Sequence, residues 1–145
     1  MKKLWYLTMM FISSLATVFV IYASYLTFYP FKVITFKNPQ NLPVDKHLYV
    51  AGEQIAITFD YQKFMDIAPK TKKEIVCDRS VTDLSELRRL PKGKDVVKLS
   101  HTIPLATPTD NHCRIYIFLE YKPNVLQTVP MTLRTAEFAV INEKL

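Results

Sequence analysis

EQIAITFDYQKF, at residues Glu53–Phe64, is the stretch that decides the fold class of this chain. Its large apolar side chains fall on every second residue and share one face: Ile55, Ile57, Phe59 and Tyr61. The other face carries smaller or polar side chains: Gln54, Ala56, Thr58 and Asp60. Strict alternation of this kind predicts a half-buried β-strand, and Ala51-Gly52 before it supplies a turn.

Other segments on both sides of this strand also have β character. They are Lys32–Lys37, Lys73–Arg79, Lys94–Ile103, Cys113–Tyr121 and Met131–Ile141. Cys113–Tyr121 (CRIYIFLEY) alternates over its whole length, and we expect it to be the central strand. In Met131–Ile141 the apolar face shifts between Leu133 and Phe138, which predicts a bulge or a change of partner strand there.

The segment 81–91 (VTDLSELRRLP) fits more than one structure. Asp83 followed by Glu86 matches the capping box of a short helix, while a short strand or an irregular crossover fits nearly as well. The turns and loops are predicted at Asn38–Pro43, Pro104–Asn111 and Lys122–Asn124, where Pro and Asn gather.

Short strands separated by such turns predict an all-β domain over residues 30–145. The expected solution is two antiparallel sheets packed face to face, an immunoglobulin-like β-sandwich, with a small barrel as the alternative. Gly occurs only 2 times in the chain and Pro 9 times. Scarce Gly argues against phosphate-cradling loops and dinucleotide-binding folds, and frequent Pro suits a domain with many turns.

Residues 4–29, from Leu4 to Tyr29, contain no charged residue, His, Gly or Pro. A helix of this length spans roughly 39 Å, more than the ~30 Å hydrocarbon core of a bilayer, so we expect a transmembrane helix. Aromatic residues stand at both of its ends, as is typical of membrane interfaces. Lys2 and Lys3 precede it, so the positive-inside rule predicts residues 1–3 in the cytoplasm and the β domain outside. The alternative is a cleaved secretory signal, but the apolar stretch is long for one and good cleavage sites are lacking.

Cys77 and Cys113 are the only cysteines. An exported domain permits a disulfide between them, and two unlinked buried thiols are the other reading. Short paired Cys or His spacings, Gly-rich loops and nucleophile motifs are all lacking, so we expect no metal site, no cofactor and no enzyme. The net charge of +6 is too small by itself to indicate nucleic-acid binding.

Two groups of residues are candidates for a partner or lipid surface. One is the basic run, which comprises Arg88, Arg89, Lys92, Lys94 and Lys98. It could face anionic headgroups or an acidic partner, but a solvated turn and strand edge is the commoner meaning of such a run. The other is the pair Tyr116 and Phe118, which alternation places on the outer face of the central strand. Exposed aromatics there often mark a binding surface, unless the two faces are reversed or 81–91 covers them.

Several stretches resemble a group of small membrane-anchored bacteriophage proteins. They are YPF (Tyr29–Phe31), KVITFK, AGEQIAITFDYQKF, LPKG (Leu90–Gly93), EYKPN (Glu120–Asn124) and RTAEFAVI. Proteins of that group pair one N-terminal span with an immunoglobulin-like domain, so the resemblance implies a phage protein in the bacterial inner membrane, without an active site.

These patterns together indicate a protein whose partners are the lipid bilayer and an envelope or phage protein. We expect the exported domain to bind that protein without catalysing a reaction. The alternative is a lysis or envelope-disruption factor acting through the transmembrane helix, and a virion membrane component is a third option. The sequence carries no indication of oligomeric state.

Overall fold

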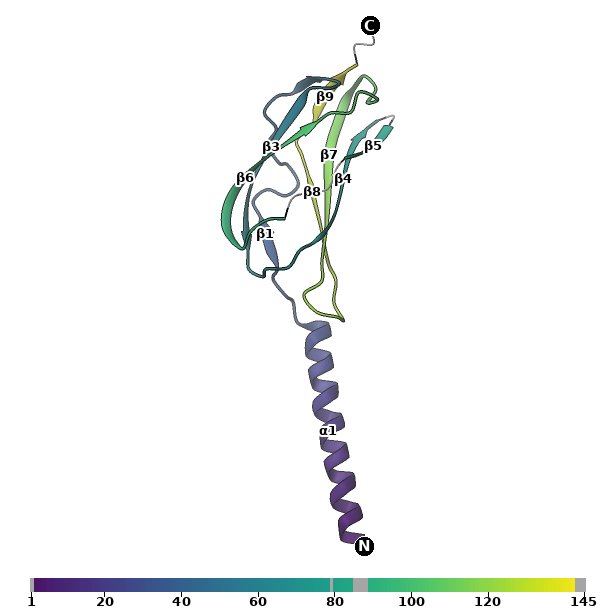
Figure 1. The fold of residues 1–145 in the computed structure, drawn as a ribbon. Helices are drawn as coiled ribbons and strands as arrows, with labels where there is room; N and C mark the ends of the chain where they lie inside the picture. The colour runs from purple at the N-terminus through teal and green to yellow at the C-terminus, as the bar shows by residue number, and fades with distance from the viewer. Residues whose placement is uncertain (1, 79, 85–88, 143–145) are drawn as a thin grey trace.

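A long helix and a β-rich domain make up the structure, which is a computed structural model describing residues 2–78, 80–84 and 89–142. Helix α1 (Lys2–Phe28) projects from one end of the domain, and none of its residues is buried against the rest of the chain (Figure 1). Its mean hydropathy of 1.9 and its length make it the one helix among the described residues that could cross a membrane. Only Tyr29–Val33 separate it from the first strand.

The first sheet has the strand order β1-β3-β6 and is antiparallel throughout. Its strands are β1 (Ile34–Phe36), β3 (Gln54–Lys63) and β6 (Gly93–Thr102). The predicted alternation in β3 is confirmed, because Ile55, Ile57, Phe59 and Tyr61 are all buried. β3 lies between the two others, so it is the central strand of this sheet.

The second sheet has the order β2-β9-β7-β4-β5, with β8 also paired to β7. Its strands are β2 (Leu48–Val50), β4 (Lys70–Cys77), β5 (Ser80–Leu84), β7 (Asp110–Tyr121), β8 (Val129–Arg134) and β9 (Phe138–Ile141). The central place of β7 is confirmed, because it pairs with β4, β8 and β9.

A bulge or a change of partner strand was predicted between Leu133 and Phe138. The strand is interrupted there, but the partner strand does not change. β8 and β9 both pair with β7, along different parts of its length, and Thr135–Glu137 lie between them. The pairing of β7 with β9 also shifts register between Asp110 and Cys113.

The prediction of purely antiparallel sheets is wrong at β2, which runs parallel to β9. β2 has only three residues, too few for an alternation to be read from the sequence. Its Tyr49 side chain is fully buried, packs edge-on against Phe138 at 5.4 Å between ring centroids, and donates its hydroxyl to Asp45. This anchored ring adds to the backbone hydrogen bonds that hold the edge strand beside β9, such as that from the Ala139 amide to the His47 carbonyl at 2.8 Å.

The short helix predicted to begin at Asp83 is not formed. Asp83 lies within strand β5, opposite Glu74, as the alternative of a short strand predicted. Val81 to Leu84 alternate between exposed and half-buried positions, which favours a strand edge over a helical turn. Glu86 and its neighbours at 85–88 lie outside the described residues.

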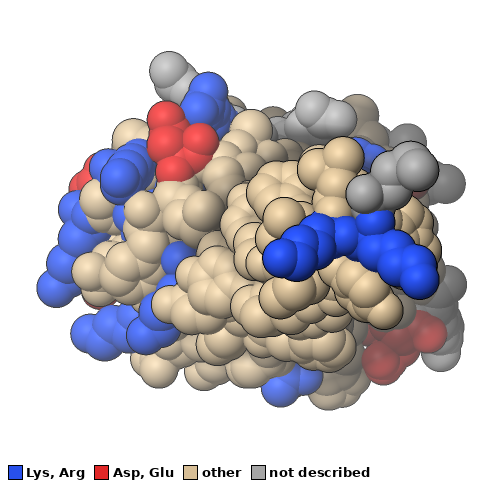
Figure 2. Space-filling view, turned by 90° about the horizontal axis from the view of Figure 1, so that it is seen from below, with Lys and Arg blue, Asp and Glu red and all other residues tan. Residues whose placement is uncertain are grey.

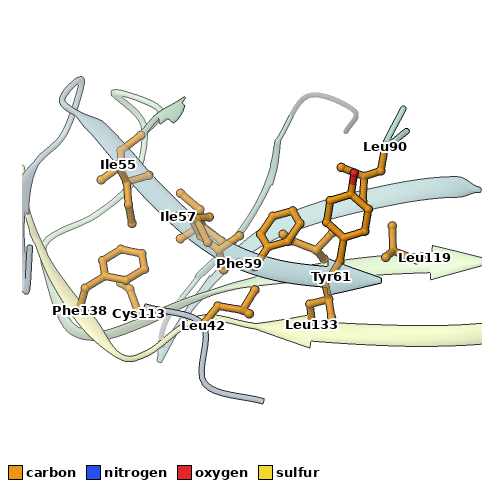
Figure 3. Close-up of a cluster of buried hydrophobic side chains, with 14 of the residues drawn as sticks. Leu42, Ile55, Ile57, Phe59, Tyr61, Leu90, Cys113, Leu119, Leu133 and Phe138 are labelled. Carbon is orange, nitrogen blue, oxygen red and sulfur yellow. The ribbon is translucent and has the colours of Figure 1, made fainter. Parts of the chain in front are cut away.

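The hydrophobic core fills the space between the two sheets (Figure 3). From one side come the inward side chains of β3, and from the other those of β7, which are Cys113, Ile115, Ile117, Leu119 and Tyr121. Leu42, Leu90 and Leu133 also belong to this core. Because both sheets use alternate residues for this core, every intervening side chain on β7 points to the opposite, outer face.

Candidate interaction surface

The outer face of β7 carries a stacked pair of aromatic rings. Tyr116 and Phe118 have ring centroids 6.2 Å apart and planes inclined by 14°. The residues between and beside them, Ile115 and Ile117, are fully buried, so alternation turns both rings outward. Phe118 remains 37% exposed, which is unusual for a large apolar ring on a central strand.

Charged side chains frame this pair. Register places Lys72 opposite Phe118 and Glu74 opposite Tyr116 on β4, and Arg134 opposite Tyr116 on β8. Directly opposed residues share a face of the sheet, so these side chains surround the rings. Lys72 forms ion pairs with Glu74 and with Asp83, and Arg134 Nε donates to the Gln40 carbonyl at 2.8 Å. We call Lys72, Glu74, Tyr116, Phe118 and Arg134 the aromatic face.

A shallow groove lies at one end of the aromatic face, lined by residues of β4, β7 and β8. It has a volume of about 230 Å³, and Phe118, Lys72 and Thr132 are among the residues that line it. Phe118 is the one aromatic ring among the described residues that line the groove. The aromatic face as a whole adds Tyr116 and Arg134, and aromatic and Arg side chains are enriched at protein-binding surfaces.

The basic run lies elsewhere on the molecule. Lys94 and Lys98 project from the exposed face of β6, in the first sheet, whereas Val97 and Leu99 turn to the core. The structure therefore places these lysines on the opposite side of the domain from Tyr116 and Phe118. The basic run and the pair Tyr116 and Phe118 therefore do not form a single surface.

The remaining members of the basic run have separate surroundings. Arg89 donates to Asp66 at 3.0 Å, so its charge is partly neutralised. Arg89, Lys92 and Lys98 line an open groove of about 880 Å³ beside β6. Arg88 lies outside the described residues.

Cys77 and Cys113 are joined in a disulfide, the bonded alternative of the two that the sequence left open. The bond links β4 to β7, where the two residues are register partners in the same sheet. Both are buried in the core. The bridge thus joins the two strands that carry the aromatic face, at the last residue of β4 and near the start of β7.

A buried polar pair was not foreseen from the sequence. Lys73 of β4 is 1% exposed, and its Nζ lies in hydrogen-bond contact with Nε2 of His101 on β6, across the space between the sheets. Burial lowers the pKa of Lys73 to about 8, and burial together with the Lys73 charge lowers the pKa of His101. The sequence did indicate that both side chains face the core. Lys73 alternates in phase with Ile75 and Cys77, and His101 alternates in phase with Leu99.

The junction between helix and domain is a second feature that sequence reasoning missed. Asn124, in the loop between β7 and β8, donates Nδ2 to the backbone carbonyl of Leu26 at 3.0 Å. Tyr25, Tyr29 and Phe31 form a ring cluster beside it, with Tyr29 4.8 Å from Tyr25 and 4.9 Å from Phe31 between centroids. The loop therefore rests on the end of α1 (Figure 1).

Within residues 2–78, 80–84 and 89–142, no three His, Cys, Asp or Glu side chains are grouped so as to hold a metal ion.

Comparisons with known proteins give no family. No protein-family model and no curated protein matches the chain. Among solved structures, a Niemann-Pick type C2 protein from the Japanese carpenter ant is similar with a TM-score of 0.44 and 11% identity, over 75% of this chain and 93% of that one. The alkylpurine DNA glycosylase AlkC of Pseudomonas fluorescens is similar with a TM-score of 0.37 and 18% identity, over 74% of this chain and 30% of that one. At this level neither protein's activity or ligand is transferred to this chain.

Proposed function

We propose that this chain is a single-pass protein of the bacterial inner membrane whose exported immunoglobulin-like domain binds a protein partner through the aromatic face. The observation that carries the proposal is the stacked, partly exposed pair Tyr116 and Phe118 on the central strand. Rings held flat by a rigid sheet lose little conformational entropy on binding, and they contribute large apolar area. The role is recognition and not catalysis.

The immunoglobulin-like assignment is supported by strand order. In such domains the strands named A, B and E are neighbours in one sheet, and C, F and G are neighbours in the other with F in the middle. Here β1, β3 and β6 form one series, and β4, β7 and β9 form the other with β7 in the middle. The likeness to membrane-anchored phage proteins described above is a further reason for this proposal.

The proposed topology places the N-terminus in the cytoplasm and the domain outside, because Lys2 and Lys3 precede the helix. A C-terminal alkaline phosphatase fusion, which is active only outside the cytoplasm, tests this. Activity supports the exported domain, whereas a stably expressed but inactive fusion overturns it.

The partner surface is tested by affinity capture of the tagged full chain from host membranes. A Tyr116→Ala/Phe118→Ala variant is expected to lose a partner that the wild type retains. Val96→Ala is the matched control, since Val96 is an exposed apolar residue on β6 in the other sheet. A charge-reversed variant, with Lys92, Lys94 and Lys98 changed to Glu, is expected to behave like the wild type. If the aromatic variant captures the same proteins as the wild type, the surface assignment is wrong.

The competing function, membrane disruption by α1, has weaker support. The hydroxyls of Thr8, Thr17 and Thr27 each donate to a backbone carbonyl four residues earlier, so these groups are already satisfied within the helix. A pore would need polar groups turned to its lumen. Rapid depolarisation on induced expression, measured with a membrane-potential dye, would favour disruption over partner binding.

A further inference from the structure

The loop between β7 and β8 exposes two apolar side chains at the end of the domain nearest the helix. Val125 is 95% exposed and Leu126 is 53% exposed. Single exposed apolar residues are common on soluble proteins, but two consecutive ones at a loop tip beside a membrane helix are not explained by folding. They need a partner outside the chain.

Asn124 fixes where this tip lies. Its Nδ2 donates to the Leu26 carbonyl at 3.0 Å, and its Oδ1 accepts from the Leu126 amide at 2.9 Å. One side chain therefore holds the loop in a turn and also attaches that turn to the last turn of α1. The tip is thereby kept at the level where the apolar helix ends.

Basic and aromatic residues occupy the same end of the domain. Lys122 starts the loop, Lys32 lies just after α1 with its Nζ 5.7 Å from the Phe64 ring centroid, and Lys70 begins β4 opposite Glu120. Seen from below, most of the visible face is neither acidic nor basic; Lys and Arg side chains form separate groups around it, and Asp and Glu are few (Figure 2). Phosphate groups, which every phospholipid carries, are the complement of such a surface.

We propose that Val125 and Leu126 insert into the interfacial layer of the bilayer that α1 spans, with Lys122 at the level of the lipid phosphates. The domain is then attached to the membrane at two points, the helix and the loop. This proposal rests on the membrane anchoring proposed above. Attachment at two points would fix the orientation of the domain. The strands would then extend away from the bilayer, and the aromatic face would be roughly perpendicular to the membrane plane.

The test uses the full chain in phosphatidylcholine and phosphatidylglycerol vesicles, with and without brominated phosphatidylcholine as a quencher. Trp5 is the only Trp, so the wild type reports on the helix alone. A Trp5→Phe/Val125→Trp variant moves the single reporter to the loop tip. The matched control is Trp5→Phe/Leu105→Trp, because Leu105 is 73% exposed in the loop between β6 and β7, at the end of the domain far from α1 (Figure 1).

Quenching of more than about half of the Val125→Trp emission is expected, with a blue shift, since interfacial side chains enter some 5–10 Å into the headgroup and acyl boundary. The Leu105→Trp emission should be unaffected. The proposal is overturned if Val125→Trp behaves like Leu105→Trp while wild-type Trp5 is quenched. It is also overturned if Val125→Trp is shifted to the blue without quenching, because a protein surface then covers the tip. Absence of quenching at Trp5 itself would instead show that the anchor has failed.

Discussion

The side chain of Asn124 supplies the Leu26 carbonyl with the hydrogen-bond donor that the helix cannot provide. In an α-helix that carbonyl would accept from the residue four positions later, which is Pro30 and has no N–H. Asn124 Nδ2 takes its place at 3.0 Å. A helix end is thus satisfied by a residue far away in sequence, and the same bond attaches the domain to the helix.

Replacing Asn124 by Ala is expected to release the loop without unfolding the domain. The Leu126 amide loses its acceptor and the Leu26 carbonyl its donor, so amides of the loop should exchange with solvent faster. The free energy of unfolding should fall by only about 1–3 kcal/mol, since two hydrogen bonds with a usual net value of about 0.5–1.5 kcal/mol each are lost. Hydrogen-exchange mass spectrometry of the 122–128 segment measures the first effect.

Asn142→Ala is the matched control for that experiment. Asn142 also bridges backbone groups with its amide, to the carbonyls of Leu105 and Thr107, but at the opposite end of the domain. It should speed exchange there and leave 122–128 unchanged. Equal exchange of 122–128 in wild type and Asn124→Ala would contradict the role given to Asn124.

The Cys77–Cys113 disulfide should contribute measurably to stability. The two residues are 36 apart in sequence, and a loop of that size corresponds to roughly 2–4 kcal/mol in the chain-entropy account. A Cys77→Ala/Cys113→Ala variant is therefore expected to unfold at lower denaturant concentration in detergent micelles, followed by circular dichroism. Ala suits these buried positions better than Ser, which would bring unpaired hydroxyls into the core. Coincident unfolding curves for the variant and the oxidised wild type would contradict the prediction.

Long alternating segments were predictable because each contains enough residues to show which face is buried. β3 and β7 are of this kind, and their inward residues were identified correctly. β2 was missed since it has only three residues, and the contact of its Tyr49 with Phe138 joins residues distant in sequence. The alternation placed Lys73 and His101 in phase with buried residues, but their contact, like that of Asn124 with Leu26, joins residues distant in sequence and could not be predicted. Tyr116 and Phe118 could be placed on an outer face, but their separation from the basic run depends on which sheet each strand joins.

The two faces of β7 should respond differently to truncation. Ile117 is fully buried between the sheets, so Ile117→Ala is expected to cost about 2–5 kcal/mol of unfolding free energy. Phe118 is its neighbour but is turned outward, and Phe118→Ala should cost about 1 kcal/mol or less, mainly from lost stacking on Tyr116. Denaturant titration of both variants in micelles measures the difference. A loss at Phe118 as large as that at Ile117 would show that the ring supports the fold and is not free for a partner.

Lys73 and His101 should make the stability of the domain depend on pH in two separate windows. Both pKa values are lowered in the folded protein, so the unfolded chain binds more protons and stability rises with pH in each window. For Lys73 the rise lies between about 8 and its ordinary value of 10.5, and it amounts to something on the order of 3 kcal/mol. For His101 the same sign means that stability falls as pH drops below its ordinary value of 6.5, since an imidazolium would then face the Lys73 ammonium.

Lys73→Met should reduce the upper window, because an unbranched apolar side chain replaces one buried charge. Lys63, which is 1% exposed and whose pKa is also lowered by burial, keeps its own share of the rise. We expect it to raise the unfolding free energy at pH 7 by about 1–3 kcal/mol, as when buried charges elsewhere are replaced by apolar groups. Lys72→Met is the control, since that side chain is 63% exposed on the outer face and its pKa is raised by Glu74, not lowered by burial. Denaturant midpoints measured from pH 5 to 10.5 give both windows. If Lys73→Met keeps the wild-type rise above pH 8 while Lys72→Met loses it, the assignment of that rise to the buried lysine is wrong.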